Sequence, residues 1–257
     1  NSTAIKSSTI QHLTENTGFA NKVRRLLEIE SKGKMQYGVK RGKIHASNVY
    51  RVVLKDSPGY NERIFKKKIK SSVLDSAVLI LGDISGSMSG SKSEHLLVSF
   101  CHLSDALGNA LHIPLELLGF TEFECRNAIF VWRKFNDTIL SREKLASRIS
   151  HSFNYMNQNA DGDSIIYAYY KLIQRKEKRK VLLVLSDGSP ATSRGGDVWG
   201  YTKNVIAAIE KDRRVDILGI GIIDDNVKKL YKQHKVIKQI SELEPALLSI
   251  IERKILR

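Results

Sequence analysis

The fold can be predicted from the stretch Val78–Lys92, which has the sequence VLILGDISGSMSGSK. It begins within an apolar run, 77–81, whose length and composition are typical of a strand buried on both faces. It continues into a polar segment in which Asp83, Ser85 and Ser87 are spaced two residues apart. Apolar residues then recur at three- and four-residue steps, as on one face of a helix: Leu96, Leu97, Phe100, Leu103, Leu107 and Leu111. The stretch therefore predicts a buried strand, a tight polar loop and a helix, and open α/β sheets place their ligand sites at such loops.

Two kinds of ligand fit this loop. The oxygen donors of Asp83-x-Ser85-x-Ser87 suit Mg²⁺, which prefers hard oxygen ligands and keeps some of its waters. The overlapping segment Gly86–Ser93 departs from the phosphate-binding pattern G-x-x-x-x-G-K-[ST] at Ser91, where the pattern has glycine. The carboxylate of Asp83 would also repel a phosphate. A solvated turn is the alternative without function, because serine and glycine are common in turns.

Two further oxygen-bearing segments help to decide between these ligands. The apolar run 181–185 predicts a second buried strand that ends near Asp187, although an acidic strand end is also found in phosphate-loop ATPases. Between the two strands, Asp161 and Asp163 come directly before a helical run. A metal site predicts a third oxygen-rich loop, whereas a phosphate loop does not require one. The three loops together favour a cation.

These loops resemble the metal-ion-dependent adhesion site (MIDAS) of von Willebrand factor A (VWA) domains. The segments that carry the resemblance are Asp83-x-Ser85-x-Ser87, 118–121, 161–163, 186–190 and 218–221. In this combination they are most similar to the C-terminal VWA domain of the cobaltochelatase T subunit (CobT) family of cobalamin biosynthesis. The resemblance covers the chain from about residue 19 onward, weakly before 72 and well after it.

The resemblance implies that the cofactor is Mg²⁺ or another divalent cation such as Mn²⁺ or Ca²⁺. Its ligands would include Asp83, Ser85, Ser87 and Asp187. Most VWA domains use a threonine of the middle loop as a further ligand, and Asp163 falls at that position here. Asp161 is close enough to compete, so either carboxylate can complete the set. The extra charge should hold the cation more firmly and leave it less electrophilic towards a partner's carboxylate.

From residue 72 onward, predicted strands and helices alternate, which indicates a parallel sheet with helices on both faces. The fold class is α/β, a VWA-type, Rossmann-like, doubly wound and mostly parallel sheet. One antiparallel edge strand is expected at 128–135, because only a short turn separates it from the strand at 114–120. Residues 72–257 would form the VWA domain. Residues 1–71 would be a basic N-terminal extension that packs on it.

The extension carries much of the excess charge of the protein. Residues 1–77 contain 16 basic and 6 acidic residues, so they account for +10 of the net charge of +15. Within them, 35–44 is expected to form a hairpin and 62–70 a lysine-rich edge strand. Such a surface suits an acidic partner or a nucleic acid, although no nucleic-acid-binding motif supports the latter and scattered lysines are usually only solvated.

The cysteines, the apolar segments and the candidate catalytic residues limit the class of protein to which the chain can belong. Cys101 and Cys125 form neither a disulfide framework nor a zinc pattern, and they fit a reducing compartment. No run reaches the ~18 apolar residues of a membrane span, and no signal peptide is visible, so we expect a cytoplasmic protein without a membrane partner. No Ser/His/Asp arrangement is evident, and no general base apart from the carboxylates, so no catalytic residue is assigned.

The resemblance implies a non-catalytic subunit that binds a partner through a cation-organised surface. In the cobaltochelatase family the partner is a ring-forming AAA+ ATPase of the MoxR type (CobS-like), and with a large chelatase subunit the pair inserts cobalt into a corrin ring. That family usually carries an acidic stretch ahead of this domain, whereas the preceding segment here is basic. The alternatives are an adaptor of an AAA+ protein-remodelling machine and, less favoured, a nucleotide hydrolase that uses Lys92. We expect the long loop 187–200 to contact the partner.

Overall fold

The computed structural model describes residues 21–22, 25, 35–53, 62–68 and 75–250. The chain divides into two compact units, one of Asn1–Arg25 with Asp75–Arg257 and one of Leu26–Leu74. The predicted domain boundary at residue 72 lies outside the described residues, and the packing of residues 1–71 on the VWA domain stays a prediction. None of the described helices is long and apolar enough to span a membrane.

The unit Leu26–Leu74 contains a three-stranded antiparallel sheet of order β1-β3-β2. Its elements are β1 (Met35–Val39), β2 (Lys43–Ile44), η1 (Ala46–Asn48), α3 (Tyr50–Val53) and β3 (Phe65–Lys68). Two predictions are wrong here, because β1 and β2 do not pair as a hairpin and β3 is the central strand rather than an edge. The link between β1 and β2 passes close to β3, where a Cβ on Gly42 would lie 2.5 Å from the carbonyl oxygen of Lys66. Glycine therefore permits the crossing that separates the two strands.

The unit that contains Asp75–Arg257 has a six-stranded sheet of order β6-β5-β4-β7-β8-β9. The strands are β4 (Ser76–Asp83), β5 (Leu115–Phe123), β6 (Arg126–Arg133), β7 (Arg179–Ser186), β8 (Asp216–Ile222) and β9 (His234–Ile237). Neighbouring strands are parallel except β5 and β6. The turn between these two uses Glu124 and Cys125, both with positive φ, and so tight a turn can join only antiparallel strands. The predicted fold class, with one antiparallel edge strand, is confirmed.

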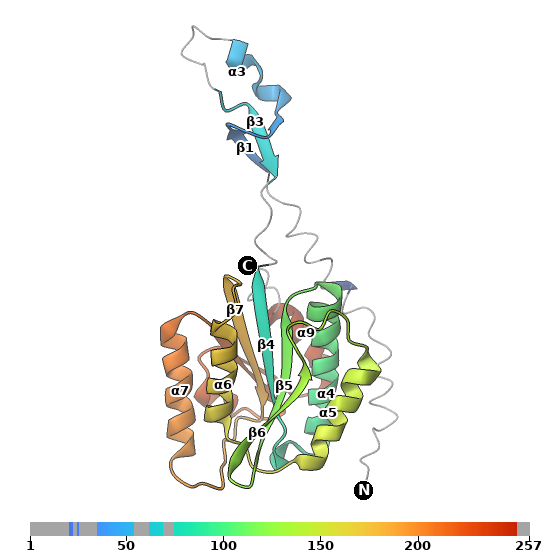
Figure 1. The fold of residues 1–257 in the computed structure, drawn as a ribbon, viewed down its shortest axis with the longest axis vertical. Coiled ribbons are helices and arrows are strands. Elements are labelled where there is room, and N and C mark those ends of the chain that lie inside the picture. Colours follow the sequence, from blue (N-terminus) through green and yellow to red (C-terminus); the bar gives the residue numbers. More distant parts are fainter. Residues whose placement is uncertain (1–20, 23–24, 26–34, 54–61, 69–74, 251–257) are drawn as a thin grey trace. The chain divides into compact units, whose positions relative to one another are not determined.

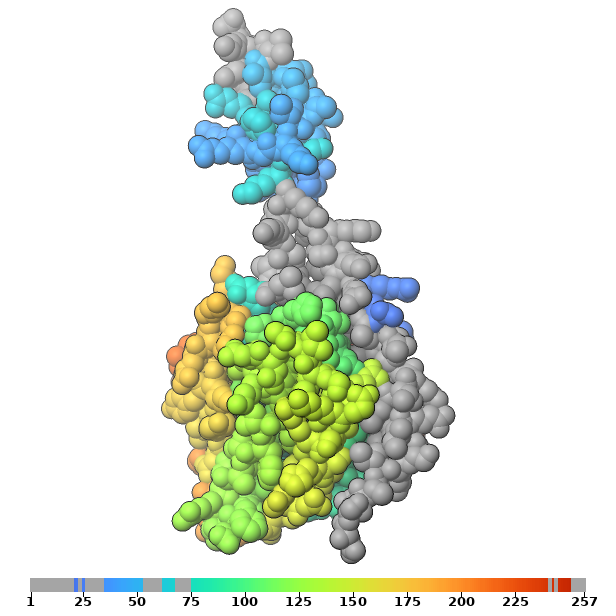
Figure 2. All heavy atoms as spheres, turned by 45° about the vertical axis from the view of Figure 1, so that its right-hand side comes forward, coloured from blue at the N-terminus to red at the C-terminus, as the bar shows by residue number. Residues whose placement is uncertain are grey.

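Helices cover both faces of this sheet. They are α4 (Ser91–Leu103), the π-helix η4 (Ser104–Ala110), α5 (Arg142–Ser152), α6 (Asp161–Ile173), α7 (Val198–Asp212), α8 (Val227–Leu230) and α9 (Ile240–Ile250), with 3-10 turns η3 (Gly86–Met88) and η5 (Phe153–Tyr155). In Figure 1, α6 and α7 lie on one side of the sheet and α4 and α5 on the other. Beside the sheet edge, Arg148 of α5 donates to the carbonyl oxygen of Trp132 in β6 (2.6 Å), and these two elements share the face seen in Figure 2.

The central strand β4 is buried along its whole length, as its apolar run predicts. From β4 the chain passes through α4 to β5 on one side, and it later returns through α6 to β7 on the other. The order of the strands therefore reverses between β4 and β7. Ligand sites of open α/β sheets lie at the carboxyl ends of the strands that flank such a reversal. Asp83 ends β4 and Asp187 follows β7, so both lie at this point.

Candidate metal centre

Asp83 is completely buried and its carboxylate is held from three directions. Its Oδ1 accepts a hydrogen bond from the backbone N–H of Ser85 (2.8 Å), and its Oδ2 accepts from Nδ2 of Asn159 (3.1 Å) and from Oγ of Ser186 (2.9 Å). Burial and the nearby charge of Asp187 raise the pKa of Asp83 to about 6. A bound cation would favour the ionised form of this carboxylate.

The two serines that follow Asp83 present their hydroxyls together. The Oγ atoms of Ser85 and Ser87 lie 3.0 Å apart. Ser85 is buried and Ser87 is exposed, because the 3-10 turn η3 carries the chain outward between them. The arrangement offers two neutral oxygen donors beside a carboxylate, one of them open to solvent.

The segment Asn157–Asn159 joins the loop after β4, the end of strand β5 and the loop after β7. The backbone carbonyls of Asn157 and Gln158 accept from Gly86 N–H and Glu122 N–H (2.7 Å each). The backbone N–H of Asn159 donates to the carbonyl oxygen of Ala191 (3.1 Å). The side-chain Oδ1 of Asn159 accepts from the backbone N–H of Ala191 (2.9 Å). The segment therefore fixes these three parts of the site relative to each other.

Asp161, the first residue of α6, faces the buried carboxylates. Only 1% of it is exposed, and its Oδ2 has no hydrogen-bond partner. Burial and then the charges of Asp83 and Asp187 raise its pKa well above the usual range. A buried polar atom without a partner is costly, and its cost would be relieved by a cation bound among these carboxylates.

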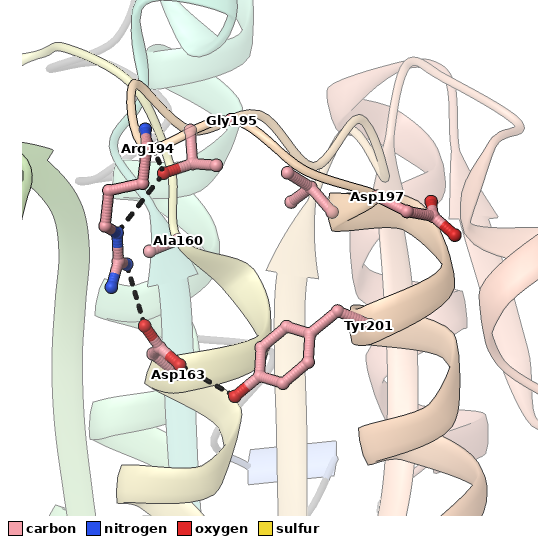
Figure 3. A pocket seen from close by; sticks show the side chains of 9 residues that line it. Ala160, Asp163, Arg194, Gly195, Asp197 and Tyr201 are labelled. Carbon is pink, nitrogen blue, oxygen red and sulfur yellow. Dashed lines mark hydrogen bonds and ion pairs between the residues drawn. The ribbon is translucent and has the colours of Figure 1, made fainter.

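Asp163 lies two residues further along α6, in different surroundings. Its Oδ2 accepts from Nη2 of Arg194 (2.7 Å) and its Oδ1 from the hydroxyl of Tyr201 (2.8 Å), and Figure 3 shows its carboxylate pointing at both. Because α6 begins at Asp161, the two residues lie on different sides of its first turn. The structure therefore brings Asp161, and not Asp163, together with Asp83 and Asp187.

Asp187 directly follows β7, is 1% exposed and uses both carboxylate oxygens. Oδ1 accepts from the backbone N–H of Ser189 (3.1 Å), and Oδ2 accepts from Nζ of Lys92 (3.0 Å). The same ammonium donates to Oδ2 of Asp224, on the loop after β8 (3.1 Å). Although partial burial opposes it, bonding to Asp187 and Asp224 raises the pKa of Lys92. The next residue, Gly188, has φ of 72°, and a Cβ there would lie 2.5 Å from the backbone nitrogen of Val227.

The loop 187–200 is fastened to the sheet by Glu122, a buried residue of β5. Its carboxylate accepts from the hydroxyl of Thr192 and from the backbone N–H of Ser193 (2.8 Å). Although burial opposes it, these bonds lower the pKa of Glu122. Arg194 continues the attachment by reaching Asp163 on α6. The loop borders a cavity of about 280 Å³ that is lined by Ala160, Gly162, Asp163, Thr192, Arg194, Gly195, Asp197, Val198 and Tyr201 (Figure 3).

Residues 127–257 match the family model described as the cobalamin biosynthesis protein CobT VWA domain. The chain belongs to this family. The matched segment contains Asp161, Asp163 and Asp187, and it begins after the loop of Asp83. The predicted relationship to the C-terminal VWA domain of CobT is confirmed.

Known proteins similar to this CobT-type VWA domain agree with the fold. The uncharacterized protein YojO of Bacillus subtilis (strain 168) is 26% identical over 198 residues, which are 72% of this chain and 30% of that protein, so the chain spans less than a third of this relative. A von Willebrand factor type A structure from Catenulispora acidiphila has a TM-score of 0.50 at 14% identity, with 74% of this chain and 44% of that chain covered. The vWF domain of the type V pili tip protein Mfa5 from Porphyromonas gingivalis has a TM-score of 0.52 at 10% identity, with 71% and 96% covered. Both structures indicate the fold alone.

The donor set of this CobT-type VWA domain fits a hard divalent cation. The candidate donors are the carboxylates of Asp83, Asp161 and Asp187 and the hydroxyls of Ser85 and Ser87. Within the described part of the chain, no three carboxylate, imidazole or thiol side chains surround one point as ligands. Mg²⁺ commonly binds proteins through one or two carboxylates and keeps several waters, so it does not require a closed cage. The hydroxyls and the unpartnered oxygen of Asp161 fit this open type of site.

Three residues of the CobT-type site were not predicted from the sequence. Asn159 and Glu122 hold the loops, and Asp224 shares Lys92 with Asp187. The sequence did contain one indication of Asp224. The acidic pair 224–225 follows a predicted buried strand, just as Asp83 and Asp187 stand at the ends of theirs. Asn159 and Glu122 offered no comparable pattern, because their roles depend on contacts across the sheet edge.

Proposed function

We propose that this CobT-type VWA domain binds Mg²⁺ or a similar divalent cation and docks through it onto a MoxR-type AAA+ ATPase. Asp83, Ser85, Ser87 and Asp187 hold the cation or its waters. Asp161, rather than Asp163, adds the carboxylate of the middle loop. The observation that carries the proposal is the unpartnered Oδ2 of Asp161, buried beside two other carboxylates. When bound, the cation supplies positive charge to the cluster and a coordination position for a partner's carboxylate.

The residues of the chain orient and expose this site. Asp83 is fixed by three hydrogen bonds, so its carboxylate is already in place before a cation binds. Ser87 and residues 193–197 of the loop after β7 form the exposed part, and a partner would approach from there. The hold of Glu122 on the loop gives that surface a defined shape. An arrangement of this kind suits recognition better than catalysis.

Membership of the CobT family supports cobalt insertion into a corrin ring as the process that this domain serves, with a large chelatase subunit as a further partner. The alternative is an adaptor of an AAA+ machine that remodels other proteins, which the basic segment before residue 78 favours. The nucleotide hydrolase is less supported, because the ammonium of Lys92 bonds two carboxylates. Cobalt chelation that requires this chain, reconstituted with the ATPase and the large subunit, would distinguish the first two.

Calorimetric titration with Mg²⁺ tests the cation site. Asp161→Asn should weaken binding by about a hundredfold or more, because it removes a carboxylate from the cluster. Asp163→Asn is the matched control and should retain the wild-type affinity, since its carboxylate serves Arg194 and Tyr201. Loss of binding in the control alone would reverse the assignment of the middle-loop ligand. Equal binding by both variants and the wild type would contradict a site at this cluster.

Sedimentation with a MoxR-type ATPase ring tests docking. The wild-type chain should co-sediment with the ring in Mg²⁺ and not in EDTA, and Ser87→Ala should weaken the association. Association that is equally strong in EDTA would contradict a cation-dependent surface.

A further inference from the structure

Lys92, the second residue of α4, bonds carboxylates that follow two different strands. Its Nζ lies 3.0 Å from Oδ2 of Asp187, after β7, and 3.1 Å from Oδ2 of Asp224, after β8. The side chain of Asp187 is 2% exposed, whereas that of Asp224 is 45% exposed. One ammonium is thus shared between a buried and an exposed carboxylate.

Lys92 supplies positive charge to a crowded acidic cluster. The carboxylates of Asp83, Asp161 and Asp187 are all buried, and they lie close enough to act on one another electrostatically. An ammonium bonded to Asp187 stabilises this cluster when no other cation is present. A divalent cation that binds beside Asp187 would meet this ammonium at short range, and like charges repel strongly where water is excluded.

Asp224 offers the ammonium a second position. Its carboxylate lies on a loop and is open to solvent, and the four-carbon stem of a lysine is flexible. The bond from Lys92 to Asp187 can therefore break while the bond to Asp224 persists. The charge of Lys92 would then be neutralised outside the buried cluster.

We propose that Lys92 competes with the divalent cation for Asp187. It is a tethered cation that holds Asp187 in the metal-free protein and moves towards Asp224 when the metal binds. This inference rests on the cation site of the proposed function, and it makes Lys92 a determinant of cation affinity. It also assigns a role to the lysine of the phosphate-like sequence pattern that involves no phosphate.

Calorimetric Mg²⁺ titrations of the full chain test the competition with two variants of opposite expected effect. Lys92→Met keeps the apolar stem and removes the competitor, so it should raise the affinity by about tenfold. Asp224→Asn removes the second position of the ammonium, so it should lower the affinity by about threefold. Lys211→Met removes the same charge from an exposed lysine in the last turn of α7, far along the helix from the site, and should leave the affinity unchanged.

Each outcome separates the competition from the cation site itself. Wild-type affinity in Lys92→Met would overturn the role of Lys92 and leave the cation site intact. Binding that is measurable in Lys92→Met but not in the wild type would support the competition. Absence of binding in the wild type and in both variants would overturn the cation site and the inference with it.

Thermal unfolding in EDTA gives a second readout that does not depend on metal. Lys92→Met should unfold at a lower temperature than Lys211→Met, because the buried carboxylates lose the ammonium bonded to Asp187. An equal or higher unfolding temperature would contradict the stabilising half of the proposal.

Discussion

Replacement of Asp161 by asparagine should have opposite consequences for the stability of the metal-free and the metal-bound protein. In EDTA the wild type keeps a buried, unpartnered carboxylate oxygen beside the charges of Asp83 and Asp187. Asparagine carries no charge, and its amide N–H can donate to the neighbouring carboxylates, so Asp161→Asn should relieve the cost of the unsatisfied oxygen, about 1–3 kcal/mol, and raise the free energy of unfolding by about 2 kcal/mol. For a unit of this size, that corresponds to an increase in Tm of about 4–8 °C.

Mg²⁺ should remove this advantage. At a free concentration of 100 times its Kd, a ligand of the native state stabilises the protein by about 2.7 kcal/mol, and the variant should lose this gain. Thermal unfolding followed by circular dichroism, in EDTA and in Mg²⁺, measures both effects. Asp163→Asn is the control and should respond to Mg²⁺ like the wild type. A variant that is less stable than the wild type in EDTA, with an unchanged response to Mg²⁺, would refute this account of Asp161.

Three further predictions concern pH, the loop and the backbone. Burial raises the pKa of Asp83 to about 6, so below that pH a proton competes with the cation for this carboxylate. The Mg²⁺ affinity measured by calorimetry should therefore fall as the pH is lowered from about 7.5 to about 5. An affinity that does not change with pH would contradict this prediction. Glu122→Gln should lower the free energy of unfolding by about 1–3 kcal/mol and speed tryptic cleavage of the loop after β7, whereas the exposed Glu124→Gln should do neither. Gly188→Ala should lower the urea midpoint, because the added Cβ meets the backbone of Val227 at positive φ, and an unchanged midpoint would show that the turn can relax.

The pH prediction has a counterpart in the stability of the metal-free protein. A raised carboxyl pKa means that the native state binds the proton more tightly than the unfolded chain does. The contribution of Asp83 should therefore decrease stability in EDTA as the pH rises from about 4 to about 6. Saturating Mg²⁺ should weaken this dependence, because the cation stabilises the ionised form.

The main sheet was predictable because its strands are buried apolar runs with clear ends. β4 and β7 are bounded by Asp83 and Asp187, and the alternation of strands and helices leaves few other topologies. The small sheet was predicted less well. Its strand order depends on how the chain crosses β3 near Gly42, and a short polar strand has no hydrophobic pattern that specifies its neighbours.

The spacing of residues along the chain was enough to predict which carboxylate the first and last loops bring to the site. It was not enough for the middle loop. Asp161 and Asp163 are equivalent in sequence until the first residue of α6 is known, and a shift of two residues separates a buried cluster from a pair with Arg194. The roles of Glu122 and Asn159 arise from contacts between segments far apart in the chain. Such contacts are set by tertiary packing, and composition or periodicity does not report them.

Anomalous diffraction from crystals soaked in Mn²⁺ would show whether a divalent cation binds where β4 and β7 end. We expect a single strong peak in contact with the hydroxyls of Ser85 and Ser87 and near the carboxylates of Asp161 and Asp187, with Nζ of Lys92 moved away from Asp187. The peak should disappear in Asp161→Asn crystals. Well-ordered crystals without a peak at this cluster, or with Mn²⁺ bound at Asp163 instead, would contradict the account.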